Sequence, residues 1–161
     1  LDCDGADRAH KDCAERKGEL VVQSALGSRS SVLFDLEGDG DLDVVTNEFG
    51  DRPQVLVSDL AQKHSDLRWL SLRLRGERSN RDGLGAWVTV TAGGRTFRRL
   101  HDGKSGYLSQ SAMPLYFGLG AAEKVDSVEV LWPSGQRQVV RSGIPVGGEL
   151  VVTEEGPAEV D

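Results

Sequence analysis

Long apolar runs are missing from this sequence, and none approaches the roughly 18 residues that a membrane-spanning helix requires. Positive charge is also scarce, because 19 Lys and Arg residues stand against 26 Asp and Glu residues and leave a net charge of −7. That balance argues against a nucleic-acid-binding protein, which would present a basic face. Methionine occurs once whereas glycine occurs 20 times, so the composition favours strands and turns over helices.

Cysteine is nearly absent, and the two that occur, Cys3 and Cys13, lie in a polar segment. No C-x-x-C motif is present, which excludes a zinc ribbon, a thioredoxin-like site and c-type haem attachment. We expect a disulfide between the two, worth about 2–3 kcal/mol, and therefore an oxidising compartment. Two unrelated thiols or half of a metal site are the alternatives. No signal peptide is visible and Leu1 is not a start methionine, so we expect a processed or excised fragment.

Motifs of catalytic machinery are missing as well. The triplet Gly103-Lys104-Ser105 is not a phosphate-binding loop, because the first glycine of that motif would fall on Arg98. No G-x-S-x-G elbow occurs, and the histidines are far apart in the sequence, at His10, His64 and His101. Without a nucleophile–base pair, the sequence predicts a protein that is not an enzyme.

What the sequence does contain is an acidic loop, in which five carboxylates alternate along residues 35–43. Alternate side chains converge only if the chain wraps around something, and five close negative charges would otherwise repel one another. A hard divalent cation removes that repulsion and accepts oxygen ligands, while Gly40 allows the sharp turn between the two halves. The sequence therefore predicts a Ca²⁺ site whose ligands are the side chains of Asp35, Glu37, Asp39 and Asp43 and the backbone carbonyl of Asp41.

The alternative to this calcium loop is a solvated acidic turn without a metal. The loop also departs from an EF-hand, because its twelfth position is Thr46 instead of the closing Glu. The flanking residues 31–34 and 42–46 have the pattern of strands rather than helices. We therefore expect a calcium loop within β structure that stabilises a fold and performs no chemistry.

The first 60 residues divide into two predicted regions. Residues 1–17 are expected to form a disulfide-tied loop, and a second, degenerate calcium loop there would use Asp2, Asp4 and Asp7. Residues 18–60 have the size of one propeller blade, with predicted strands at 19–23, 31–34, 42–46 and 54–57. A single blade cannot close a propeller. This unit is therefore expected to be the last blade of a longer array or a small sheet that packs on its neighbour.

After a polar linker at residues 60–67, the apolar pattern changes to strict alternation. Leucines at positions 70, 72 and 74 are expected on one face of a strand, and Ser71, Arg73 and Arg75 on the other. Turn signals recur about every 8–12 residues across residues 68–153, which predicts a β-sandwich or barrel. Residues 154–161 form an acidic tail that is expected to fray. The predicted fold class is all-β throughout.

Two sets of side chains have both a structural and a functional interpretation. The three tryptophans, Trp69, Trp87 and Trp132, fall in or beside alternating strands, so core packing is favoured over a sugar-stacking platform. A basic stretch within this acidic protein forms either a solvated strand face or a docking patch for an acidic partner or polyanionic glycan. Its members are Arg73, Arg75, Arg78 and Arg81.

Four motifs, in the order expected of one family, resemble the ASPIC/UnbV domain. They are residues 76–86 (GERSNRDGLGA), 105–111 (SGYLSQS), 115–120 (LYFGLG) and 125–135 (VDSVEVLWPSG). That domain typically follows repeats of the FG-GAP/VCBS type, whose blades carry D-x-x-x-D-G-x-x-D calcium loops. This pattern is matched by Asp35, Asp39, Gly40 and Asp43.

The resemblance implies the C-terminal part of a cartilage-acidic-protein-like molecule, from a family that is secreted or on the cell surface and has no established catalytic role. The sequence departs from the family in two ways: the remaining blades are missing, and the cysteine pair has no counterpart in the family pattern. We therefore expect a non-catalytic, calcium-stabilised extracellular module for binding, adhesion or assembly, located in the periplasm or on the cell surface if it is bacterial. The alternative is a carbohydrate-binding module with exposed Trp side chains. Expected partners are a protein or glycan of the cell surface or matrix, or a second copy of the chain.

Overall fold

The computed structural model describes residues 2–6, 8, 9, 13, 17, 18, 27–50, 52–107, 109–156 and 158–160. The strand expected at residues 19–23, together with Asp7 and His10, lies outside these ranges. Within them, no helix is long and apolar enough to cross a lipid bilayer.

The N-terminal loop is closed by a disulfide between Cys3 and Cys13, as expected, with 5.2 Å between their Cα atoms. The Cys3 N–H donates to the Gly18 carbonyl at 3.0 Å, and the Gly18 N–H donates to the Asp4 carboxylate at 2.7 Å. Asp2 accepts the Gly5 N–H at 2.9 Å. These acidic side chains therefore bind backbone amides of their own loop.

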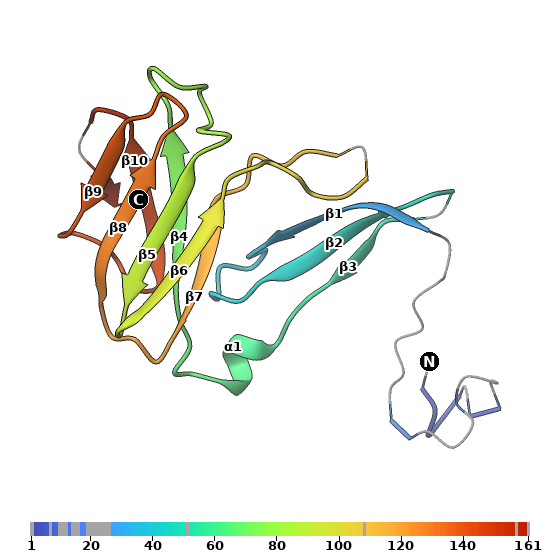
Figure 1. Ribbon diagram of the computed structural model, residues 1–161. Helices are drawn as coiled ribbons and strands as arrows, with labels where there is room; N and C mark the ends of the chain where they lie inside the picture. Colours follow the sequence, from blue (N-terminus) through green and yellow to red (C-terminus); the bar gives the residue numbers. More distant parts are fainter. Residues whose placement is uncertain are drawn as a thin grey trace.

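A small antiparallel sheet follows, in the order β1-β2-β3 (Figure 1). Its strands are β1, Ser28–Phe34; β2, Asp43–Glu48; and β3, Gln54–Leu56. A single helical turn, α1 at Leu60–Lys63, occupies the expected linker. The acidic loop is the connection between β1 and β2, so its position is fixed by two paired strands.

The rest of the chain forms two four-stranded sheets, which we call the two-sheet domain. One has the order β11-β10-β4-β7 and the other β6-β5-β8-β9. The bounds in the first sheet are β4, Arg68–Arg75; β7, Leu115–Gly120; β10, Gly148–Thr153; and β11, Ala158–Val160. Those in the second are β5, Trp87–Ala92; β6, Arg95–Leu100; β8, Val125–Leu131; and β9, Arg137–Val140. All pairings are antiparallel except β4 with β10, which run parallel.

One apolar core lies between these two sheets. The predicted alternation in β4 is confirmed, because Leu70, Leu72 and Leu74 are buried and enter this core. Valines of β5, β8 and β10 and Phe117 of β7 complete it. Trp132 is also buried in it, and its indole N–H donates to Gln138 Oε1 at 2.9 Å. Core packing therefore specifies this domain.

The all-β prediction is confirmed, since the strands form three sheets and α1 is the only helix in the described residues. None of these three sheets is closed, so this part of the chain contains neither a complete propeller nor a closed barrel. The small sheet stands beside the β7 side of the two-sheet domain (Figure 1). The Ser31 N–H donates to the Ser105 carbonyl at 3.0 Å, which joins the edge of β1 to the loop between β6 and β7.

The expectation of a frayed tail is wrong for Glu154 and for the strand β11. Glu154 is fully buried and accepts hydrogen bonds from the backbone N–H groups of residues 77, 78 and 79 and the hydroxyls of Ser79 and Ser134. Burial alone would raise the pKa of this carboxyl, but the hydrogen bonds outweigh it and lower the pKa to about 2. Glu154 thus holds the segment after β10 in place, because its carboxylate accepts five hydrogen bonds.

Candidate functional site: an acidic loop on an aromatic pair

Asp35 organises the first half of the acidic loop. Its carboxylate accepts the backbone N–H groups of Gly38 at 2.6 Å, Asp39 at 3.1 Å and Gly40 at 2.9 Å. Gly38 and Gly40 both have a left-handed backbone, with φ of 78° and 96°. The alternation of acids with glycines therefore produces a tight turn in which amides point at one carboxylate.

Asp41 and Asp43 hold the second half of the loop, and both are buried. The Asp43 carboxylate accepts the Leu36 N–H at 2.7 Å and the Ser58 N–H at 2.8 Å, so it connects the loop to the chain after β3. The Asp41 Oδ2 accepts the Ala61 N–H at 2.8 Å and so connects the loop to α1. These two acids tie three separate segments together.

The buried Asp41 Oδ1 has no hydrogen-bond partner. A buried carboxylate oxygen without a partner is costly, because removing charge from water must be offset by a donor or a cation. The pKa of the neighbouring Glu37 is raised, first by loss of surrounding water and then by the charges of Asp39, Asp43, Asp41 and Asp35. The loop thus holds more negative charge than its own amides satisfy.

The predicted ligands occupy one loop, but they do not share one centre. In the described part of the chain, no group of three or more His, Cys, Asp or Glu residues is arranged to hold a metal ion. Asp35 and Asp43 face inward toward backbone amides, whereas Glu37 is exposed. Chemically the set fits Ca²⁺, because all its donors are oxygens, Asp41 Oδ1 lacks a partner, and a carboxylate offers about four lone-pair sites.

The loop lies on a pair of aromatic rings from the two-sheet domain. Trp69 of β4 and Tyr116 of β7 are stacked, with ring centroids 5.1 Å apart and 14° between the planes. The Tyr116 hydroxyl donates to the Gly40 carbonyl at 2.8 Å. A Cβ atom on Gly40 would overlap the indole Nε1 of Trp69. Glycine is therefore required at position 40 by the turn and by the indole that lies against it.

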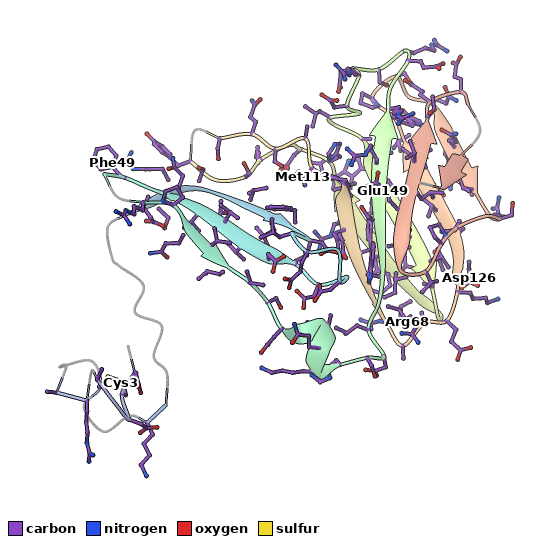
Figure 2. The ribbon with its side chains drawn as sticks, turned by 180° about the vertical axis from the view of Figure 1, so that it is seen from behind. Cys3, Phe49, Arg68, Met113, Asp126 and Glu149 are labelled. Carbon is purple, nitrogen blue, oxygen red and sulfur yellow. A yellow bond between two sulfur atoms is a disulfide. The ribbon has the colours of Figure 1, made fainter. Side chains whose placement is uncertain are left out.

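The charge of the loop also affects the hydroxyl group of Tyr116. Burial, and then the charges of Asp35, Asp39 and Asp41, raise the pKa of the Tyr116 hydroxyl, so it remains a donor. Beside the pair is a hollow of about 260 Å³ that reaches Phe34 and Asp35 on one side and Arg73 and Glu149 on the other. Figure 2 shows Met113 and Glu149 on the side of the two-sheet domain that faces the small sheet.

Sequence reasoning identified the acids of this site but missed their partners. Tyr116 lies 76 residues from Gly40, and Ser58 and Ala61 contribute through backbone N–H groups that any residue would supply. No local pattern reports such contacts. The one available signal was the glycine at position 40, which indicates a close approach without naming what approaches.

The tryptophans do not form a common platform. Trp132 is in the core, and Trp69 is stacked on Tyr116. Trp87 is 39% exposed on the outer face of β5, with the Arg98 guanidinium 4.3 Å above its ring.

The arginines of the basic stretch differ in whether they form ion pairs. Arg73 pairs with Glu149 at 2.7 Å and Arg78 with Glu155 at 3.2 Å, and the described residues contain no ion pair for Arg75 or Arg81.

Comparison with known proteins gives the family. The family described as ASPIC and UnbV matches residues 76–159, which extend from the end of β4 into β11. The chain belongs to the ASPIC/UnbV family. This confirms the resemblance found in the sequence motifs, and the match covers most of the two-sheet domain. The small sheet with its acidic loop lies before the matched residues.

Cartilage acidic protein 1 of Homo sapiens and of Mus musculus are relatives of this ASPIC/UnbV chain. Each is 34% identical over 120 residues, which cover 74% of this chain. The aligned stretch is only 18% of the relative's length in both cases, so the chain spans about a fifth of the proteins it matches. An alignment this long within 161 residues must include residues 45–115, so the likeness extends into β2 and β3.

Proposed function

We propose that this chain is a non-catalytic extracellular module for binding or assembly, and that Ca²⁺ in the acidic loop stabilises it. The observation that carries the proposal is the buried Asp41 Oδ1, which has no partner although four further carboxylates lie in the same loop. A cation would supply the missing partner and remove the repulsion between the acids. The D-x-x-x-D-G-x-x-D spacing of an FG-GAP/VCBS repeat supports the same ion.

The residues that would hold the cation are the five acids of the loop: Asp35, Glu37, Asp39, Asp41 and Asp43. Asp41 would ligate through its side-chain Oδ1, in place of the backbone carbonyl that the sequence predicted. Bound Ca²⁺ would contribute charge neutralisation and would cross-link the loop. Asp41 and Asp43 already connect the loop to α1 and to Ser58, so the stabilisation would reach the linker between the small sheet and β4. The aromatic pair under Gly40 would transmit it to the two-sheet domain.

An extracellular location is supported by the Cys3–Cys13 disulfide and by the likeness to a cartilage protein. A binding or assembly role is supported by the small sheet, because the apolar side chains of Leu33 and Val55, and of Val57 just after β3, are each more than half exposed. Such a sheet gains from a neighbour that covers it. A further blade of a longer chain, or another copy, would be such a neighbour.

The test is calorimetric titration of chelator-treated protein with Ca²⁺, combined with melting curves. We expect one ion per chain and a clear rise in melting temperature, since an ion at 100 times its dissociation constant adds about 2.7 kcal/mol of stability. Asp41→Asn should abolish this rise and should melt higher than wild type in chelator, because one repelling charge is gone.

Asp126→Asn is the matched control, because Asp126 lies on the surface beside Lys124 at 3.2 Å, far from the loop in sequence. It should keep the full calcium response. A wild-type protein that melts at the same temperature in Ca²⁺ and in chelator would refute the calcium part of the proposal. The binding role would then rest on the exposed small sheet and the family.

A further inference from the structure

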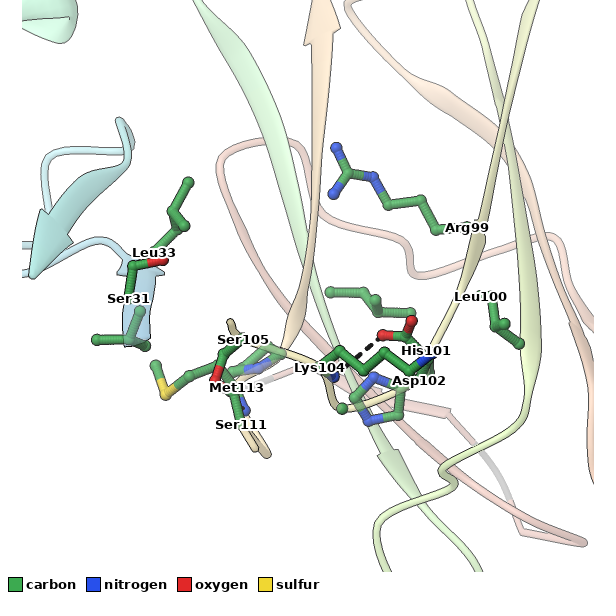
Figure 3. A pocket seen from close by; sticks show the side chains of 14 residues that line it. Ser31, Leu33, Arg99, Leu100, His101, Asp102, Lys104, Ser105, Ser111 and Met113 are labelled. Carbon is green, nitrogen blue, oxygen red and sulfur yellow. Dashed lines mark hydrogen bonds between the residues drawn. The ribbon is translucent and has the colours of Figure 1, made fainter. Parts of the chain in front are cut away.

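Two hollows adjoin at the segment that joins β6 to β7. The first has a volume of about 380 Å³ and lies between this segment and β1. The second has a volume of about 610 Å³ and lies beside the end of β4. His101, Met113 and Pro114 line both, and we refer to the two adjoining hollows together as the groove. Figure 3 shows Ser31 and Leu33 of β1 across the first hollow from Arg99 and His101.

The lining of this groove is basic although the protein carries a net charge of −7. The cations are Arg99 and Lys104 in the first hollow and Arg73, Arg75 and Arg81 in the second. The acids that line the groove are Asp82 and Asp102. Asp102 already accepts the backbone N–H of Lys104 at 3.1 Å. Positive charge is therefore in excess along the whole groove.

Within the part of the chain that the structure describes, most of these cations have no carboxylate at ion-pairing distance. Arg73 pairs with Glu149, but the described residues offer no ion pair to Arg75, Arg81, Arg99 or Lys104. Like charges that surround one groove repel one another, and an anionic ligand would relieve that repulsion. Arginine also presents a planar fork of donors that matches sulfate and carboxylate groups.

Among the described residues that line the groove, none is Trp, Tyr or Phe. Protein–protein interfaces are typically anchored by buried Trp, Tyr or Phe residues, which this groove does not provide. Burial lowers the pKa of His101, so this side chain does not add to the positive charge of the groove. The lining thus suits a hydrated polyanion held by charge and hydrogen bonds.

We propose that the groove is a binding site for a sulfated glycan, whose anionic groups would pair with Arg75 and Arg81 in the second hollow and with Arg99 and Lys104 in the first. This inference rests on the proposed role of the module in binding, but it does not require calcium. It also gives the basic stretch of the sequence a defined location, since two of its arginines lie in the groove without a carboxylate partner.

The test measures binding of a fluorescent heparin-derived oligosaccharide to the full chain, with its desulfated counterpart as a competitor. The wild-type protein should bind the sulfated probe, and the affinity should fall as salt rises. Arg75→Ser/Arg81→Ser should weaken binding about tenfold or more, because two charge-assisted contacts are lost. Arg75→Lys/Arg81→Lys should keep part of the affinity, since it preserves the charge but not the fork of donors.

The matched control is Arg95→Ser/Arg141→Ser, which removes the same charge from two exposed positions outside the groove, at the start of β6 and just after β9. It should change the affinity by no more than about twofold. Failure of the wild type to bind, equal weakening by both serine pairs, or equally tight binding of poly-glutamate or single-stranded DNA would each overturn the proposal. Each measurement is repeated in Ca²⁺ and in chelator, so that loss of the calcium response is distinguished from loss of glycan binding.

Discussion

The small sheet and the two-sheet domain bury opposite kinds of side chain. In the two-sheet domain the core consists of Leu, Val, Phe and Trp side chains from both sheets. In the described part of the small sheet and its loops, the buried side chains are the acids Asp41, Asp43 and Glu48. Some of its large apolar side chains are exposed, Leu33 by 54% and Val55 by 53%, and the others are only half-buried. The two regions are therefore stabilised by different interactions.

The difference shows how a sheet without an apolar core can still hold one conformation. Carboxylates take the place of core side chains by accepting backbone amides from three segments. This arrangement remains incomplete, because one oxygen of Asp41 and one of Glu48 lack a hydrogen-bond partner. An unpartnered buried acid destabilises a fold, whereas an apolar core side chain does not depend on ions or pH. We therefore expect the small sheet to respond to solution conditions much more than the two-sheet domain does.

The largest expected effect comes from a matched pair of leucine truncations. Leu72 is 1% exposed in β4, and Leu33 is 54% exposed in β1. Leu72→Ala should lower the free energy of unfolding by about 2–5 kcal/mol, because it removes core contacts and leaves a cavity. Leu33→Ala should change it by less than about 0.5 kcal/mol. Urea unfolding of both variants checks this, and equal losses would contradict the comparison.

A second pair separates backbone strain from contact between the two regions. Gly38 and Gly40 both have positive φ, but a Cβ on Gly38 would meet no atom within 4 Å, whereas one on Gly40 would overlap Trp69. Gly38→Ala should cost about 1–2 kcal/mol from the left-handed backbone alone. Gly40→Ala should cost about 1–3 kcal/mol more, because the indole must also move.

The readouts for this pair are amide hydrogen exchange in β1 and β2 and the fluorescence of Trp69. Exchange should accelerate more with Gly40→Ala than with Gly38→Ala, and only Gly40→Ala should change the fluorescence. The two-sheet core should remain protected in both variants. Equal exchange rates in the two variants would mean that the aromatic pair does not hold the loop.

The smallest expected effect concerns Glu154, the buried acid whose carboxylate accepts five hydrogen bonds. The pKa of Glu154 is about 2 in the folded protein and 4.5 without perturbation. Because the folded pKa is the lower one, the stabilisation is complete above pH 4.5 and is lost as the pH falls toward 2. Glu154→Gln should cost about 1–3 kcal/mol at neutral pH and should flatten this acid-dependent loss.

Glu155→Gln is the control for this acid, because Glu155 is on the surface and its pairing with Arg78 is largely exposed. Its effect should stay below about 1 kcal/mol. Urea midpoints measured at neutral pH and at several acidic pH values compare the two variants. An unchanged pH profile for Glu154→Gln would show that the five hydrogen bonds do not depend on the charge.

Elements whose pattern is local could be predicted from the sequence, and elements that depend on distant partners could not. Strict alternation at Leu70, Leu72 and Leu74 predicted β4 and its buried face, because side-chain direction in a strand follows from spacing alone. The acidic loop could also be located from the sequence, because its alternating acids lie close together at residues 35–43. Glu154 was assigned to a frayed tail because its donors come from Ser79 and Ser134, which are distant in the sequence.

The parallel pairing of β4 with β10 has a mechanical consequence. β4 opens the two-sheet domain and β10 nearly closes it, and they face each other in register from Leu70 with Gly148 to Arg75 with Thr153. Tension applied before β4 and after β10 pulls the two strands past each other, so their hydrogen bonds carry the load together. An antiparallel pair pulled from one end would open one bond at a time. Within a longer chain, this domain would therefore resist stretching and transmit force rather than yield to it.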